Sequence, residues 1–118
     1  MYICDLHIHS RFSRATSKDC DAAHLDFWAR RKGIAVLGTG DFTHPAWRKE
    51  LNEQLTLVDD GVYTLKEEFL LPNAMPGPAP RFVITGEISC IYKRFGKTRK
   101  VHNVILLPSL QAAEELSA

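Results

Sequence analysis

Two histidines near the start of the chain have the spacing of a metal-binding pair. Residues 2–6 form a short apolar run, interrupted by Asp5, that leads directly into His7 and His9. In a β-strand, side chains two residues apart lie on the same face, so both imidazoles would project together from the carboxyl end of the strand. Neutral imidazoles held in this way can chelate a divalent metal ion. The alternative is a pair of ordinary surface or buried histidines, and this stretch alone does not decide between the two.

Other residues of metal-ligating type recur just past the ends of later apolar runs. Asp41 follows the second run, with His44 close by, and Glu87 follows the third. His102 stands at the start of a later strand. Because the carboxyl ends of parallel strands share one edge of an α/β sheet or barrel, we expect these side chains to converge with the first pair. Imidazoles and carboxylates together suit zinc, manganese or iron. A carboxylate such as that of Glu87 can also bridge two ions.

Each of these residues also has an ordinary structural interpretation. Asp41 could be a turn or cap residue, Glu87 could be a solvated carboxylate, and His102 could be a core histidine. A joint coincidence of all of them is less expected than any one alone.

Two basic stretches are candidates for binding phosphate. The loop 10–18 lies beside the expected metal centre, and residues 93–100 hold five cations in eight positions, with Tyr92 and Phe95 available for base stacking. Without further information, each stretch could equally be a solvated connection. The residues predicted to contact substrate phosphate are Arg14, Lys18, Lys93, Lys97, Arg99 and Lys100.

The elements that must position these residues begin with a βαβ unit. A helix is expected over 19–32, capped by Asp19 or Asp21. His24 falls on this helix and is interpreted as an ordinary helix residue and not as a ligand. The continuous apolar run 34–38 is typical of a strand buried on both faces in a parallel sheet. The connection between the two strands should be right-handed.

The second half of the chain predicts more strands and two helices. Pro45 suits the first turn of a helix whose apolar face continues to Val58 and ends at the turn 59–61. The remaining expected elements are strands at 62–65, 68–71 and 81–85, a proline-rich loop at 72–80, a β-hairpin over 90–107 around a basic turn at 93–100, and a helix from 108. That helix is cut off barely two turns in, so we expect the chain to belong to a longer protein.

Composition limits the class of protein. The 118 residues, 45% hydrophobic and 25% charged, fit one small domain, and 15 basic against 14 acidic side chains give no global sign of a polyanionic partner. The three cysteines include no C-x-x-C pair, which excludes a zinc ribbon or a thioredoxin-type dithiol, and they are expected to be buried thiols. No signal peptide and no membrane-length apolar run are present, so we expect a reduced, cytoplasmic setting without membrane contact.

The strings that carry these residues resemble a known family. Asp-Leu-His-Ile-His-Ser at 5–10 resembles the first motif of the polymerase-and-histidinol-phosphatase (PHP) superfamily of metal-dependent phosphoesterases. Four longer strings resemble the endonuclease Q branch, which cuts DNA 5′ to deaminated bases such as uracil and hypoxanthine; they lie at 5–19, 38–45, 85–89 and 97–103. The resemblance covers essentially the whole chain. It implies an α/β fold: the N-terminal part of a distorted (β/α)7 barrel, incomplete in this chain, with a metal centre on the rim of the barrel.

The resemblance also implies roles for individual residues. The predicted metal ligands are His7, His9, Asp41, Glu87 and His102, with His44 as a further candidate and Asp5 as support behind the ligands. Asp41 and Glu87 are the predicted catalytic residues, and the cofactors are two or three ions of zinc, manganese or magnesium.

The sequence departs from the family pattern in three places. Phe42 stands where many members have a histidine, and Arg14 stands where many have an acidic residue or histidine. The late Asp-x-His motif is absent, because the chain ends first. We therefore expect residues 1–118 alone to bind metal at most and to show little or no activity.

Three functions are compatible with these patterns. The leading hypothesis is a metal-dependent DNA endonuclease of DNA repair, with DNA and the remainder of its own chain as partners. The alternatives are a small-molecule phosphoesterase on the same fold, and a non-catalytic metal- or DNA-binding PHP module attached to a replication or repair protein. An incomplete barrel also leaves a sheet edge open, which favours strand pairing or dimerisation.

Overall fold

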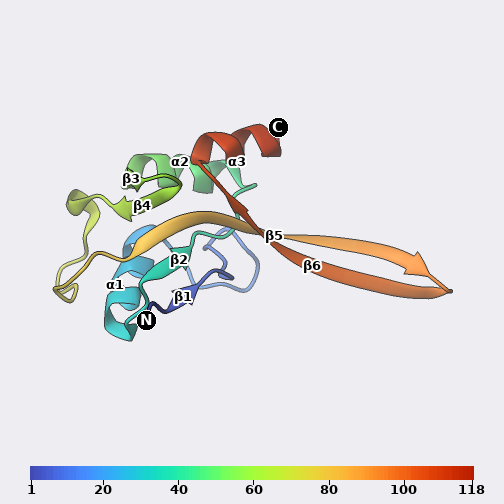
Figure 1. Cartoon of the computed structure of the whole chain (residues 1–118), viewed down its shortest axis with the longest axis horizontal. Helices are drawn as coiled ribbons and strands as arrows, with labels where there is room; N and C mark the ends of the chain where they lie inside the picture. Colours follow the sequence, from blue (N-terminus) through green and yellow to red (C-terminus); the bar gives the residue numbers. More distant parts are fainter.

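A parallel βαβ unit carries the histidine pair in the computed structural model, which describes residues 1–118 (Figure 1). Strand β1 (Cys4–Asp5) pairs in parallel with β2 (Val36–Gly38), and helix α1 (Ala22–Lys32) connects them. The Asp21 side chain accepts a hydrogen bond from the backbone N–H of His24, which caps the helix start. Gly33 ends the helix with φ 74°, a left-handed conformation that costs glycine little. The predicted strand, helix and strand are confirmed.

The sheet is mixed and open, with the order β1-β2-β5-β4-β3. Strand β5 (Arg81–Arg94) runs parallel to β2, whereas β4 (Val62–Leu65) and β3 (Leu55–Asp59) add to it in antiparallel fashion. The α/β class is therefore confirmed. The placement of β2 between two parallel neighbours agrees with its uninterrupted apolar sequence.

Two predicted elements are wrong. Helix α2 (Pro45–Gln54) ends before the predicted boundary at Val58, because Leu55 turns into β3 and pairs with Leu65, where both side chains are buried. Residues 68–71 do not form a strand. A 3₁₀-helix, η1 (Glu67–Phe69), takes their place, and the N–H of Leu70 bonds back to the carbonyl oxygen of Glu67.

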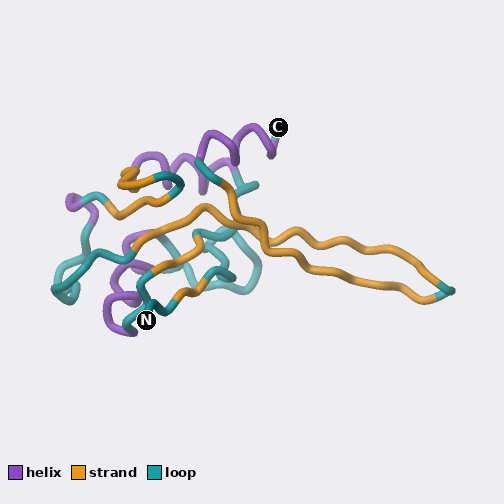
Figure 2. The backbone as a smooth tube through the Cα atoms, viewed as in Figure 1, coloured by secondary structure: helices purple, strands orange, loops and turns teal.

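The hairpin is much longer than predicted. Strands β5 and β6 (Lys97–Leu107) pair from Ile84↔Leu107 to Arg94↔Lys97, and only Phe95 and Gly96 form the turn. Most of the predicted basic turn therefore lies in strands. The outer half of the hairpin projects from the body and gives the molecule its 54 Å long axis (Figures 1 and 2).

The core lies between the sheet and the helices. Trp47 and Leu51 of α2 and Phe82 and Ile84 of β5 are fully buried. Helix α3 (Leu110–Ser117) packs beside α2, and the Tyr63 hydroxyl accepts a hydrogen bond from the N–H of Leu110 at 3.1 Å. No helix is both long and apolar enough to cross a membrane.

The prediction of buried cysteines is wrong for two of the three. Cys4 and Cys90 are exposed and Cys20 is half-buried, and all three are free thiols. Cys4 lies on an edge strand of only two residues, and Cys90 lies on the projecting hairpin, so neither position has a layer to cover it.

Candidate metal centre

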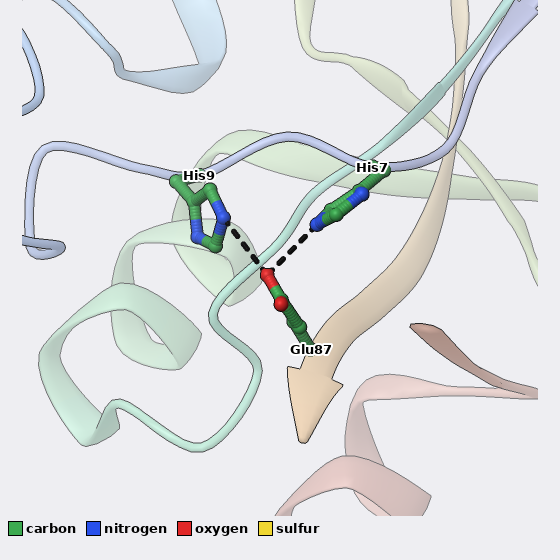
Figure 3. A group of neighbouring side chains, drawn as sticks. All are labelled: His7, His9 and Glu87. Carbon is green, nitrogen blue, oxygen red and sulfur yellow. Dashed lines mark hydrogen bonds and ion pairs between the residues drawn. The ribbon is translucent and has the colours of Figure 1, made fainter. Parts of the chain in front are cut away.

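Three side chains meet at the carboxyl ends of β1 and β2 (Figure 3). His7 Nε2 lies 2.8 Å from Glu87 Oε2, and His9 Nε2 lies 3.2 Å from the same oxygen. One ligand atom from each of the three lies within 4.8 Å of the others. The histidines come from the segment after β1, whereas Glu87 comes from β5 just past its pairing with β2. The two-residue spacing thus places both imidazoles beside one carboxylate.

His102 reaches the other oxygen of the same carboxylate. Its Nδ1 lies 2.6 Å from Glu87 Oε1 and 2.8 Å from the hydroxyl of Ser89, its cross-strand partner. Three imidazoles thus surround Glu87, with different ones at its two oxygens. The hydrogen bond from His7, together with the positive potential of His7 and His102, holds the pKa of Glu87 below its ordinary value. An ionised carboxylate engaged through both oxygens is the form that can bridge metal ions.

Asp41 contacts the cluster from behind, through His9. Asp41 Oδ1 lies 3.2 Å from His9 Nδ1, the nitrogen that faces away from Glu87. Its Oδ2 accepts hydrogen bonds from the N–H and hydroxyl of Ser10, at 2.7 and 2.6 Å, and from the hydroxyl of Ser13 at 2.8 Å. Burial raises the pKa of Asp41, but these hydrogen bonds outweigh it and the net shift is downward. Asp41 therefore stays ionised and orients the His9 ring.

Ser10 and Ser13 are the functional residues that sequence reasoning did not assign. Ser10 is completely buried, although it belongs to a stretch of ordinary loop composition. The motif at 5–10 includes Ser10, but only the fold reveals that both hydroxyls point to one carboxylate 28 to 31 residues further along the chain.

The loop that follows His9 is tied to helix α2. Arg11 forms a two-point salt bridge with Glu50, and Phe12 stacks on His44 with ring centroids 4.4 Å apart. These contacts fix the direction in which the chain leaves His9. The predicted ligand His44 stacks on Phe12 and does not belong to the group formed by His7, His9 and Glu87.

Close backbone approaches hold the strand ends together. A Cβ on Gly38 would lie 2.5 Å from the Thr85 hydroxyl, and one on Gly40 would lie 2.2 Å from the carbonyl oxygen of Ile8. A Cβ on Gly86 would lie 2.2 Å from the ring of Phe42, which is 1% exposed. Phe42 thus fills the space above Gly86 and belongs to the core.

The remaining predicted site residues lie outside the cluster. Asp5 is exposed on β1, and no hydrogen bond joins its side chain to either histidine. Arg14 and Lys18 are exposed in the loop before α1. The other predicted phosphate contacts, Lys93, Lys97, Arg99 and Lys100, are exposed on the hairpin.

The geometry of the cluster fits a divalent metal. Zinc lies about 2.0–2.1 Å from histidine nitrogen in a tetrahedral site, which separates neighbouring ligand atoms by roughly 3.3 Å. The nitrogen–oxygen distances of 2.8 and 3.2 Å are within about 0.5 Å of this value. The side chains of His7 and His9 are 54% and 39% exposed, so an ion and a substrate can both reach them. Imidazoles and a carboxylate that meet at the edge of an α/β sheet make this a candidate metal centre.

Comparison with known proteins finds one curated relative and two similar solved structures. No family model matches the chain. The chain is 34% identical over 112 residues to the uncharacterised protein MJ0043 of Methanocaldococcus jannaschii, of which it spans 10%. It is also similar to the crystal structure of the lesion-specific endonuclease PfuEndoQ from Pyrococcus furiosus, with TM-score 0.71 and 29% identity over 97% of this chain and 24% of that one.

A second solved structure, which contains DNA, matches the chain to the same extent. Endonuclease Q in complex with a 27-mer duplex substrate, which has an abasic lesion at the active site, matches with TM-score 0.70 and 29% identity. The match again covers 97% of this chain and 24% of the endonuclease Q chain. The chain is thus similar in structure to part of a lesion-specific endonuclease, and it spans about a quarter of that enzyme's length.

Proposed function

We propose that this chain forms the metal-binding part of a DNA endonuclease that cuts 5′ to deaminated bases in DNA repair. The observation that carries the proposal is the convergence of His7, His9 and His102 on Glu87, in a fold similar to that of endonuclease Q. The predicted PHP-type barrel would be completed by the remainder of a longer protein, because the chain spans 24% of the solved structures.

The residues of the chain have separate tasks in this proposal. His7, His9, Glu87 and His102 would hold the ions, and Asp41 would orient His9. When bound, zinc, manganese or magnesium supplies an activated water and neutralises charge on the phosphodiester. The two oxygens of Glu87 contact different imidazoles, so both would be available to hold metal. Exposed cations on the hairpin and the loop before α1 are available for backbone phosphates.

Two observations favour a second candidate, a non-catalytic metal- or DNA-binding module. Phe42, which is buried in the core, stands where many PHP proteins have a histidine, so one imidazole is missing from the site. In addition, Asp41 Oδ2 already accepts hydrogen bonds from the hydroxyls of Ser10 and Ser13. A site with fewer ligands could hold a metal without cutting DNA.

A nicking assay distinguishes these functions. The longer protein is incubated with duplexes that contain uracil, hypoxanthine or an abasic site, and with an undamaged duplex, in the presence of Mn²⁺, Mg²⁺ or Zn²⁺. We expect metal-dependent cleavage of a damaged duplex only, abolished by Glu87→Gln. Metal binding without cleavage would support the non-catalytic module. Hydrolysis of a small phosphomonoester, with all DNA left intact, would support a small-molecule phosphoesterase.

A further inference from the structure

The outer hairpin has no partner within the chain. Every residue from Ser89 to Val104 is exposed, and a two-stranded hairpin of this kind is marginally stable on its own in water. The same segment contains five lysines and arginines and not one aspartate or glutamate. This excess of positive charge favours an anionic partner, and a phosphate backbone is one.

Strand register divides the cations into two rows. Paired residues of an antiparallel ladder point to the same side, and successive pairs alternate between the two faces. The pairs Ser89↔His102, Ile91↔Lys100 and Lys93↔Thr98 share a face with Glu87. The pairs Cys90↔Val101, Tyr92↔Arg99 and Arg94↔Lys97 lie on the opposite face.

The row with Glu87 continues directly from the metal cluster. Ser89 and Glu87 both contact His102 Nδ1, which confirms that these three side chains share one side of the hairpin. At about 3.4 Å per residue, Lys100 lies about 7 Å from His102 along the strand, and Lys93 opposite Thr98 lies about 14 Å away. One strand of duplex DNA advances about 3.4 Å per phosphate along its axis, so the row spans about four phosphates.

We infer that the Glu87 face of the hairpin is a track for one DNA strand, which Lys100 and Lys93 guide from the hairpin tip to the metal cluster. This inference rests on the proposed function, since it takes the strand to be the one that is cut. It distinguishes among the cations of the hairpin: Lys93 and Lys100 contact phosphates near the scissile bond, and Arg94, Lys97 and Arg99 face away from that strand.

Matched double variants test the track. Lys93→Gln with Lys100→Gln and Arg94→Gln with Arg99→Gln remove the same charge from the same hairpin on opposite faces. In the longer protein, on a damaged duplex, the first pair should lower kcat/KM at least tenfold, mostly through KM, and the second should lower it no more than threefold. In metal-free buffer with EDTA, fluorescence anisotropy should show that the first pair also reduces the slope of log Kd against log salt by about 1.5. Equal losses from both pairs, or a larger loss from the second, would overturn the track.

Failure of the track differs from failure of the proposed function. If the protein cuts DNA but the two pairs behave alike, the track is wrong and the endonuclease stands. If metal-free binding depends on Lys93 and Lys100 but no metal restores cleavage, the hairpin binds DNA and the endonuclease proposal fails. Circular dichroism and the urea unfolding midpoint of each variant establish that folding is unchanged.

Discussion

Replacement of Asp41 by asparagine tests whether this carboxylate positions His9 or binds metal itself. Its Oδ2 accepts three hydrogen bonds from Ser10 and Ser13, and its Oδ1 lies 3.2 Å from His9 Nδ1. Asparagine keeps the shape of the side chain but presents one amide NH₂ group where an acceptor is needed. We expect Asp41→Asn to weaken metal binding without abolishing it, because the ligating nitrogen of His9 is still present.

The size of this effect follows from the position of Asp41 behind a ligand. Groups that hold the far nitrogen of a ligating histidine typically contribute tenfold to a hundredfold in metal affinity, or about 1.4–2.7 kcal/mol. The upper part of this range is expected, because the same carboxylate also fixes Ser10, the residue directly after His9.

Isothermal titration of Zn²⁺ and Mn²⁺ into the metal-free protein at neutral pH measures the effect. Asp60→Asn, a change at an exposed turn residue, is the matched control and should bind metal as the wild type does. A dissociation constant for Asp41→Asn equal to that of the control would refute the positioning role. Complete loss of binding, as expected for His9→Ala, would show that Asp41 is itself a ligand.

Three further predictions concern the stability of the fold, two from new variants and one from the pH dependence of Asp41→Asn. Gly86→Ala should lower the free energy of unfolding by about 2 kcal/mol or more, because its Cβ would lie 2.2 Å from the Phe42 ring. Urea unfolding measures this loss. If a second substitution, Phe42→Leu, recovered none of it, the proposed clash would be wrong. Phe95→Asn should slow amide exchange at the hairpin tip, a gain of about 0.5 kcal/mol, because Phe95 has φ 53° and asparagine tolerates this conformation better; unchanged or faster exchange would contradict it. Asp41 has a lowered pKa in the folded state, so its contribution to stability is complete above its unfolded pKa and is lost as the pH falls through the folded value. The stability difference between the metal-free wild type and Asp41→Asn should therefore be constant at neutral pH and shrink below about pH 4, and a difference independent of pH would refute this reasoning.

The sequence predicted the parts of the site that depend on regular periodicity. The two-residue spacing of His7 and His9, and the apolar runs before Asp41 and Glu87, are local signals, and parallel pairing brings the ends of those runs together. The cap by Asp21 and the stop at Gly33 are equally local.

The parts that were missed depend on tertiary contacts. Helix α2 ends at Gln54 because Leu55 finds a strand partner in Leu65, which no pattern in the helix reveals. The hydroxyls of Ser10 and Ser13 matter only because Asp41 is folded against them. The hairpin itself was predicted, but residues 93–100 were assigned to its turn, since a dense run of cations resembles a solvated turn. The strands in fact extend to Arg94 and Lys97.

The most direct measurement is anomalous diffraction from crystals of the protein with Zn²⁺ or Mn²⁺ at saturating concentration. We predict a peak within about 2.0–2.2 Å of His7 Nε2, His9 Nε2 and an oxygen of Glu87, in place of the direct contacts between the imidazoles and the carboxylate. A map with no peak there, and with the 2.8 Å contact between His7 and Glu87 intact, would contradict the metal centre on which the proposed function depends.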